Sequence, residues 1–422
     1  MSSIPLSGSK FTLDASGVAG FFGGDEAVAA MTIVHVYQGR KWLGWYNSPG
    51  SYLIAKKCSQ LANSRFWDGS FPGVNTNAAT LGGLDGSKGP KFKGVESGSI
   101  LPETGPLASL MAKECQMERG IDVPGRKTQP VGVTIVDLHY TPEATTTPKQ
   151  LTKYTSVFAF IPMSVSIGTC IASALFEDWY SFSMILLGIV ANGLSCLVLG
   201  SGNFTFSHPI PAPGAPRGDG LLLADNNTIV LIGQEGAVNS ITRGKFSLNF
   251  DSETEYRNIG ICSSILTAQC IAQLLLIPQA TLFGQIMFLA SLAVSFAYTS
   301  WLSSFDKSEI QRRLLVDAVL KRPLMTKYML GTRTTMAVFV LLALNPSDPA
   351  KVLDDLLPND TKVWRTWKTI ILSRLQDGEK MHFETGDWDD GSFNGSESSL
   401  LKTLLGDAQA AYDGYCDHQK LH

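Results

Sequence analysis

The sequence predicts an α-helical membrane protein with four transmembrane helices, arranged as two hairpins, and a mixed α+β cytosolic domain. Three observations predict this class: long stretches without charge, an uneven placement of Lys and Arg, and strand and helix patterns in the polar segments. Only 17% of the 422 residues are charged, whereas an average soluble protein has about 25%. The uncharged residues must therefore be concentrated in parts of the chain.

Long stretches of the chain contain no Asp, Glu, Lys or Arg. They are residues 154–176, 179–216 and 258–305. A helix that crosses the hydrocarbon core of a bilayer needs about 20 mostly apolar residues. The stretches provide four segments of that kind: Thr155–Leu175, Ser181–Ser201, Asn258–Ile277 and Ala280–Leu302. The buried helical core of a soluble protein is the alternative, but four such segments without charge are rare in soluble cores.

Basic residues predict the topology. The four spans divide the chain into five parts: an N-terminal segment 1–153, a first hairpin 154–201, a β-rich loop 202–257, a second hairpin 258–305 and a helical C-terminal segment 306–422. All 34 Lys and Arg residues lie outside the two hairpins. Because basic residues favour the cytosolic side, we expect the three polar parts and both termini in the cytosol. The sequons are then expected to stay unglycosylated; they begin at Asn203, Asn226, Asn359 and Asn394.

Short elements are predicted within the polar parts. Alternating or β-branched runs predict strands at Met31–Val36, Val131–His139, Leu221–Leu223, Thr228–Ile232, Val238–Ile241 and Phe246–Phe250. Helices are expected at Leu107–Glu118, Lys307–Leu320, Thr334–Leu344, Thr361–Leu375 and Ser399–Tyr412. We expect the small sheet of the central loop to pack against residues 1–153, because it is too small to be stable alone. The apolar run Thr334–Leu344 is too short to span a bilayer, so it is either buried or re-entrant.

Polar residues inside the predicted spans are the first candidate site. The strongest are the amides Asn192, Gln269, Gln273 and Gln285. An amide surrounded by lipid needs a hydrogen-bond partner, so these side chains should face neighbouring helices as structural contacts. A polar pathway is the alternative. No span carries Asp, Glu, Lys, Arg or His, which argues against proton-coupled transport and voltage sensing.

An amphipathic helix is the second candidate site. In Thr361–Leu375, Trp364 and Trp367 lie on an apolar face, and three basic residues lie on the other: Lys362, Arg365 and Lys368. Asp360 is the predicted N-cap. Such a helix either docks on the cytosolic domain or lies in the headgroup layer of the membrane.

No catalytic, metal or cofactor motif is present in the sequence. An EF-hand loop starting at Asp387 fails because Gly391 and Ser392 occupy the positions that need a ligand and a glycine. The His residues lack metal-ligand spacing, and Cys-x-x-Cys and His-Glu-x-x-His are absent. A net charge of −3 gives no sign of nucleic-acid binding. We therefore predict no cofactor, with the lipid bilayer as the partner; a homo-oligomer and a small-molecule or ion ligand stay open.

One part of the chain resembles known sequences. Residues 234–244, Gln-Glu-Gly-Ala-Val-Asn-Ser-Ile-Thr-Arg-Gly, lie within Gly218–Phe250. This stretch, together with the last two spans, resembles uncharacterised multi-pass membrane proteins of filamentous fungi. The resemblance implies a membrane protein and brings no activity and no functional residues.

The expected function is a non-catalytic binding, scaffolding or regulatory role at a membrane. An oligomeric channel or small transporter is the first alternative, in which Asn192, Gln269 and Gln273 would line a pore between protomers. A membrane enzyme, or a subunit of one, is the second alternative.

Overall fold

The computed structural model of the chain describes residues 5–6, 9, 13, 22–31, 33, 41–60, 88–148, 154–224, 227–250, 253–389 and 393–421. The chain divides into two compact units. The first, called the helical unit below, comprises residues 1–85, 147–206 and 246–314. The second, called the α/β unit, comprises residues 86–146, 207–245 and 315–422. Each unit is therefore assembled from three separate stretches of chain.

The helical unit contains four helices that are long and apolar enough to cross a membrane, as predicted. They are centred on α5 (Phe160–Leu175), α6 (Trp179–Leu199), α8 (Glu253–Leu276) and α9 (Leu282–Ser303). The short 3-10 helices η4 (Tyr154–Ala159) and η5 (Ile277–Gln279) extend α5 and α8. The first pair turns at Glu177, and the second turns at Ala280 and Thr281, directly after η5; both turns lie between the predicted spans or at their edge.

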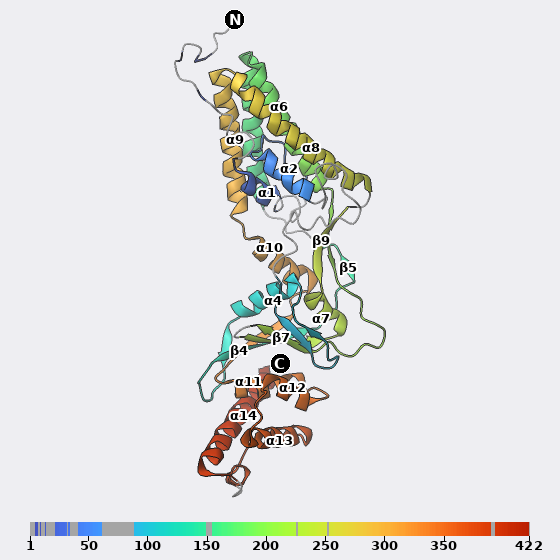
Figure 1. The fold of residues 1–422 in the computed structure, drawn as a ribbon, viewed down its shortest axis with the longest axis vertical. Helices are drawn as coiled ribbons and strands as arrows, with labels where there is room; N and C mark the ends of the chain where they lie inside the picture. The colour runs from blue at the N-terminus through green and yellow to red at the C-terminus, as the bar shows by residue number, and fades with distance from the viewer. Residues whose placement is uncertain are drawn as a thin grey trace. The chain divides into compact units, whose positions relative to one another are not determined.

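Two short helices from the N-terminal segment also belong to the helical unit. Helix α1 (Gly24–Met31) packs against α9, and α2 (Ser51–Gln60) packs against α8 (Figure 1). The predicted segment 1–153 is therefore shared between the two units. The strand predicted at Met31–Val36 is wrong at its start, because Met31 ends α1; apart from Ile33, the rest of that strand lies outside the described residues.

The α/β unit contains a mixed sheet of seven strands in the order β2-β1-β7-β8-β4-β10-β3. The strands are β1 (Lys91–Gly94), β2 (Ile100–Leu101), β3 (Gly120–Asp122), β4 (Val131–Leu138), β7 (Gly220–Ala224), β8 (Asn227–Gly233) and β10 (Leu324–Leu330). Strand β4 pairs in parallel with β8 and antiparallel with β10. As expected, the loop strands pair with the N-terminal segment, β7 with β1 and β8 with β4.

Helices cover both faces of this sheet (Figure 1). Helices α4 (Pro106–Met117) and α7 (Glu235–Thr242) contact each other and strand β8. Helix α11 (Arg333–Leu344) contacts β4, β8 and β10, and also packs against α14 (Gly395–Leu421). Because both faces are covered, β4 and β8 are runs of buried β-branched and apolar residues. The run predicted at Thr334–Leu344 is therefore a buried helix of the α/β unit.

The prediction of a strand at Val238–Ile241 is wrong, because these residues lie in α7. Every residue from Gly236 to Thr242 is buried, so this eight-residue helix has almost no exposed face, although it contains the polar residues Asn239, Ser240 and Thr242. The remaining loop strands are confirmed, with β9 (Lys245–Asn249) pairing with β6 (Asn203–Ser207). Strand β5 (Thr145–Thr146) is a further short element.

The C-terminal helices agree with the predictions in position but differ at their ends. The chain continues through α10 (Lys307–Arg313), the π-helix η6 (Leu314–Val319), α12 (Pro349–Leu356), α13 (Lys362–Gln376) and the 3-10 helix η7 (Thr385–Asp387). Helix α14 begins earlier than predicted because Asn394 and Glu397 form reciprocal side-chain to backbone hydrogen bonds at its start. The predicted N-cap Asp360 is not the cap. Thr361 holds that position, and Asp360 pairs with Arg365 instead.

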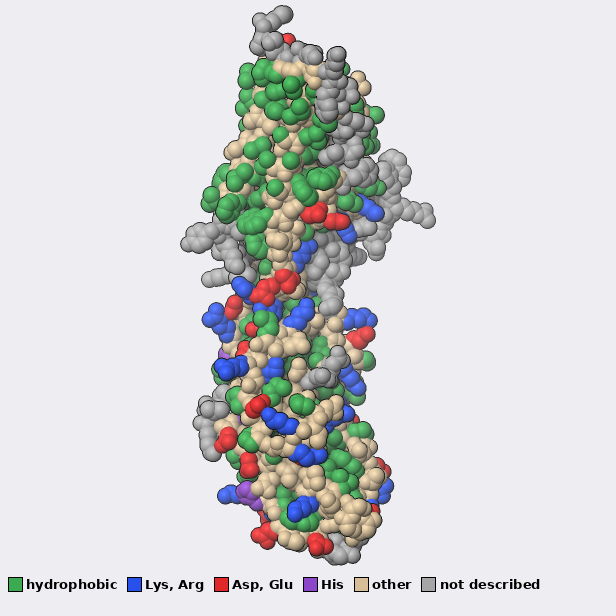
Figure 2. Space-filling model, turned by 90° about the vertical axis from the view of Figure 1, so that its left-hand side faces the viewer, with side chains coloured by type: hydrophobic (Ala, Val, Ile, Leu, Met, Phe, Trp, Pro, Cys, Tyr) green, Lys and Arg blue, Asp and Glu red, His purple; other side chains and the backbone are tan. Residues whose placement is uncertain are grey.

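The two units carry different surfaces. On the face shown in Figure 2, hydrophobic side chains cover most of the described surface of the helical unit, whereas Lys, Arg, Asp and Glu are scattered over the α/β unit. The core of the α/β unit is apolar and centres on α11, with Phe339, Leu353, Trp367 and Leu405 fully buried. The helical unit has two smaller apolar clusters.

Candidate functional site: buried amides in the helical unit

The four predicted amides are all buried inside the helical unit. Asn192 on α6 is 2% exposed, Gln269 and Gln273 on α8 are 1% and 0% exposed, and Gln285 on α9 is 6% exposed. Gln273 Nε2 donates to the carbonyl of Met184 on α6 at 3.3 Å. Gln285 Nε2 donates to the carbonyl of Ala280 in the turn before its own helix, at 3.1 Å. The structure therefore brings Asn192, Gln269 and Gln273 into the interior of a single chain.

Asn192 contacts a segment of the chain that the sequence analysis does not place among the four long helices. Its Nδ2 donates to the carbonyl of Gly44 at 2.6 Å. Gly44 belongs to residues 41–60, called the inserted segment below, which enters the helical unit as irregular chain and leaves it as α2.

The inserted segment runs along α6 and towards its middle. A β-carbon on Gly200 would stand 2.4 Å from Lys41, and one on Gly193 would stand 2.4 Å from the ring of Trp45. Further along, a β-carbon on Gly188 would stand 2.0 Å from Asn47 Oδ1. The small residues of α6 are therefore what allow the inserted segment to lie directly against that helix.

The segment returns along α8. The hydroxyl of Ser263 on α8 donates to the carbonyl of Ala55 on α2 at 2.9 Å. Lys57 lies near the end of α2, and Lys307 directly follows α9. The pKa of Lys307 is lowered by burial and, to a smaller extent, by the positive charge of Lys57. Since Lys41 lies at the C-terminal end of α6 and Lys57 lies near the chain that follows α9, the segment enters and leaves at the same end of the helices.

The deepest described part of the inserted segment is the turn Asn47–Gly50. The Asn47 backbone N–H donates to Ser166 Oγ on α5 at 3.0 Å, and its Nδ2 donates to Ser291 Oγ on α9 at 2.8 Å. Ser166 and Ser291, like Gly188, lie near the middle of their helices. The turn ends at Gly50, whose φ of +73° favours glycine. Asn47 therefore contacts α5, α6 and α9 halfway along the helical unit.

Several buried oxygens in the helical unit have no hydrogen-bond partner among the described residues. They are Asn47 Oδ1, Gln269 Oε1, Gln273 Oε1, Gln285 Oε1, Ser51 Oγ, Ser295 Oγ and Ser300 Oγ. Buried polar atoms in folded proteins are nearly always paired, with protein or with water. The unpaired amide oxygens of Asn47, Gln269 and Gln273 accordingly mark the centre of the unit as the strongest candidate site in the chain.

A buried carboxylate joins the two helix pairs at their turns. Asp178 caps α6 by accepting from Ser181 N at 3.0 Å, and it also accepts from Thr281 N at 2.8 Å and Thr281 Oγ1 at 2.5 Å. Thr281 in turn caps α9, since its hydroxyl accepts from Gly284 N. Asp178 therefore links the start of α6 to the residue that precedes α9.

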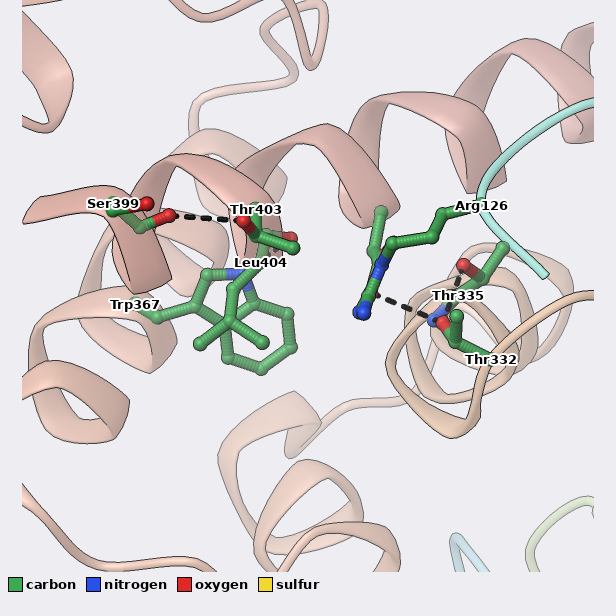
Figure 3. Close-up of polar contacts among 8 residues, drawn as sticks. Arg126, Thr332, Thr335, Trp367, Ser399, Thr403 and Leu404 are labelled. Atoms are coloured by element: carbon green, nitrogen blue, oxygen red, sulfur yellow. Dashed lines mark hydrogen bonds and ion pairs between the residues drawn. The ribbon is translucent and has the colours of Figure 1, made fainter. Parts of the chain in front are cut away.

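The predicted amphipathic helix is α13, and its apolar face packs inside the α/β unit. Trp367 is fully buried, and its Nε1 donates to the carbonyl of Leu404 on α14 at 3.0 Å (Figure 3). The ring of Trp364 packs edge to face against that of Trp367. The three basic residues have partners within the unit: Lys362 lies over the ring of Phe393, Arg365 pairs with Asp360, and Lys368 pairs with Asp354. These contacts favour the docked helix over a helix in the headgroup layer.

A polar network in the α/β unit was not predicted from the sequence. Arg126 donates to the buried Asp407 of α14 at 2.7 and 3.2 Å, and the Thr332 hydroxyl donates to Asp407 at 3.1 Å. Thr332 also caps α11 through the backbone N–H of Thr335 (Figure 3). The hydrogen bonds to Asp407 raise the pKa of Arg126. Arg126 and Asp407 are 281 residues apart, so no local pattern could have linked them.

The part of the chain that the structure describes holds no group of three or more His, Cys, Asp or Glu residues placed to bind a metal ion. Comparison with models of protein families, with curated proteins and with solved structures finds no match to the chain. Any functional assignment must therefore rest on the geometry of the chain itself.

Proposed function

We propose that the chain is a four-span integral membrane protein with both termini in the cytosol. In this proposal the α/β unit is a cytosolic unit with a binding, scaffolding or regulatory role and no catalysis. The observation that carries the proposal is that the four long helices have an apolar outer surface while their amides lie inside.

The outer surface of the four long helices is apolar. Ile167 and Ile171 on α5, and Ile271 and Leu275 on α8, are about half exposed or more. In water such a surface would be costly, at about 25 cal/mol for each Å² of apolar area. Against hydrocarbon it has no such cost. The polar side chains of the same helices point inward, which is the arrangement that a lipid environment favours.

The construction of the α/β unit supports the topology. Its sheet takes β1 and β4 from before the first helix pair, β7 and β8 from between the pairs, and β10 from after the second pair. If the helices cross a bilayer, these three stretches must lie on one side of it, because they form one sheet. The Lys and Arg residues lie in the same three stretches, which makes that side the cytosol.

The amide positions bear on the alternative of an oligomeric channel. A pore between protomers would need Asn192, Gln269 and Gln273 on the outside of the helical unit. These side chains are instead enclosed by helices and the inserted segment of the same chain. This observation favours the four-span binding protein over a pore between protomers.

The test is membrane extraction combined with glycosylation mapping of the full chain expressed in a eukaryotic cell. We expect the chain to stay in the membrane pellet after alkaline carbonate extraction. We also expect glycosidase treatment to leave its mass unchanged, although Asn359 and Asn394 lie in sequons. Release by carbonate would contradict the membrane assignment. A glycosidase-sensitive mass that disappears in Asn394→Gln would contradict the topology.

A further inference from the structure

The α/β unit contains an open cavity at one end of its sheet. Its volume is about 350 Å³, and sites for small molecules usually measure about 300 to 1,000 Å³. The parallel strands β4 and β8 both begin at this end, at Val131 and Asn227, and β7 ends there at Ala224. Helix α11 begins beside them, because β10 pairs with β4 and leads into that helix. All the lining residues belong to the α/β unit, so the cavity is a feature of that unit alone.

Three polar side chains that line the cavity have no hydrogen-bond partner among the described residues. They are Gln129, Asn227 and Arg333. Asn227 lies opposite Gly132 on β4, and a β-carbon at Gly132 would stand 2.1 Å from Asn227 Oδ1. The glycine thus leaves room for the amide beside the cavity. In ligand sites, a few polar groups of this kind fix the orientation of the bound molecule.

The rest of the lining is mostly apolar. It includes Val131, Leu223, Met336 and Leu356. Thr228 also lines the cavity and is 5% exposed. Its hydroxyl donates to Met336 Sδ at 3.9 Å, and a thioether sulfur is a weak acceptor. A molecule that fills the cavity therefore needs an apolar body in addition to polar atoms.

The uncompensated charge at the cavity is positive. Its charged lining residues are Arg333 and Asp355. Asp355 is paired with Lys93 on β1, whereas no acidic residue pairs with Arg333 in the part of the chain that the structure describes. Further lysines lie near Lys93, since burial and then the charges of Lys351 and Lys91 lower the pKa of Lys93. A negatively charged group would therefore balance the cavity, and a cation would not.

We propose that this cavity binds a small organic anion through Arg333. A guanidinium group presents parallel N–H donors that match either a carboxylate or a phosphate. The amides of Gln129 and Asn227 provide further donors for the same group, and the apolar body of the ligand lies against Met336 and Leu356. This inference rests on the proposed function in one respect, the binding role of the α/β unit. It does not require the helical unit to cross a membrane.

The experiment measures the binding of three aromatic probes of similar size to the full chain in nanodiscs of zwitterionic lipid. Benzoate carries a carboxylate, phenyl phosphate carries a phosphate, and benzamide is uncharged. Saturation-transfer difference NMR gives the dissociation constant of each probe after subtraction of empty nanodiscs. We expect at least one anion to bind, and benzamide to bind about tenfold more weakly, because a hydrogen bond between ions contributes about that much. No binding of either anion, or equal binding of benzamide, would overturn the proposal.

A matched pair of arginine variants tests the site itself. Arg333→Met removes the charge from the cavity and keeps an unbranched side chain, whereas Arg243→Met removes an exposed arginine that does not line it. Arg333 is also exposed, so its replacement should leave the fold intact. We expect the dissociation constant of the bound anion to rise about tenfold in Arg333→Met and to keep its wild-type value in Arg243→Met. Equal values in the two variants would contradict the site.

A further variant changes the charge of the cavity without changing its size. Asn227→Asp replaces an amide by a carboxylate, which would repel an anion at the same place. We expect this variant to lose anion binding, and wild-type binding would count against the proposal. Failure of the proposed topology is distinguishable, because carbonate extraction tests it without any ligand. A protein that stays in the membrane pellet but binds neither anion contradicts this site alone.

Discussion

The two units of this protein differ in the side chains that they expose and in the amides that they bury. In the α/β unit the deepest positions are apolar, as at Trp367 and Phe339. In the helical unit the deepest positions include Asn47 and Gln273, while isoleucines such as Ile271 face outward. Both units have apolar clusters inside, so the difference lies in the apolar surface and the buried amides of the helical unit. Under the proposed function, this difference is what a lipid-facing unit and a water-facing unit should show.

The units also differ in how their elements approach one another. In the α/β unit, large side chains of α11, α13 and α14 fill the space between helix and sheet. In the helical unit, glycines and serines at the contacts let the inserted segment lie directly on α6. Small residues at helix contacts are typical of packing in lipid, where hydrophobic attraction between helices is absent.

The largest expected effect concerns the apolar core of the α/β unit. Trp367→Ala removes a fully buried ring and its hydrogen bond to Leu404, so we expect the free energy of unfolding of that unit to fall by about 4 kcal/mol. Denaturant titration followed by circular dichroism measures this loss. The partly buried Trp364 is the matched control, and an equal loss in Trp364→Ala would show that α13 is not docked through Trp367.

The next effect concerns the apolar outer surface of the helical unit. Ile271 is 54% exposed on α8, and Ile121 is 43% exposed on β3. If the helical unit faces lipid, Ile271→Lys should destabilise it by about 3 kcal/mol, whereas Ile121→Lys should have almost no effect. Thermal unfolding in lipid nanodiscs compares the two variants. Equal stability of both would break the comparison between the units.

A smaller effect is expected where a charge is buried in the helical unit. Asp178→Ala leaves Thr281 and the start of α6 without an acceptor, so we expect a loss of about 2 kcal/mol. The exposed neighbour Glu177 provides the control variant Glu177→Ala. Thermal unfolding in nanodiscs measures both, and a wild-type melting temperature for Asp178→Ala would show that the turns are held in another way.

The smallest effect depends on pH and concerns the surface of the α/β unit. Two hydrogen bonds from Ser347, from its backbone N–H and its hydroxyl, lower the pKa of Glu96 below its ordinary value. The stabilisation is therefore present above the ordinary carboxyl pKa and is lost as pH falls through the lowered pKa. Because Glu96 is only partly buried at the surface, solvent screens this interaction and we expect a contribution under about 1 kcal/mol.

Melting temperatures of the wild type and Glu96→Gln across this pH range check the sign. We expect the advantage of the wild type at neutral pH to disappear in acid. An advantage that grows in acid would contradict the assigned direction.

The predictable parts of the fold are those that local composition determines. The four long helices follow from charge-free runs, and β4 and β8 follow from β-branched runs between turns. The buried amides were predictable because an amide on an apolar helix needs a partner.

The inserted segment was not predictable for a physical reason. Its residues are mixed in polarity and include Lys41 and Lys57, and its burial depends on contacts with Gly188 and Ser291, far away in the sequence. Likewise Val238–Ile241 was predicted as a strand from its mixture of apolar and polar residues beside the turn at Arg243–Lys245, whereas these residues lie in the buried helix α7. Long-range contacts decide where these two segments lie, and a short local pattern does not contain them.

The position of β4 has a consequence for how the protein is made. This strand leaves the ribosome before the first helix pair, yet one neighbour, β8, follows that pair and the other, β10, follows the second pair. The central strand therefore lacks both of these neighbours until β8 is made and lacks one of them until β10 is made, and such non-local pairing is slow. If the helices cross a membrane, a pair of which only one helix inserted would leave β8 or β10 on the other side and β4 with an open edge. Under the proposed topology, completion of the sheet therefore requires both helices of each pair to insert, and an open edge on β4 would mark a chain in which they did not.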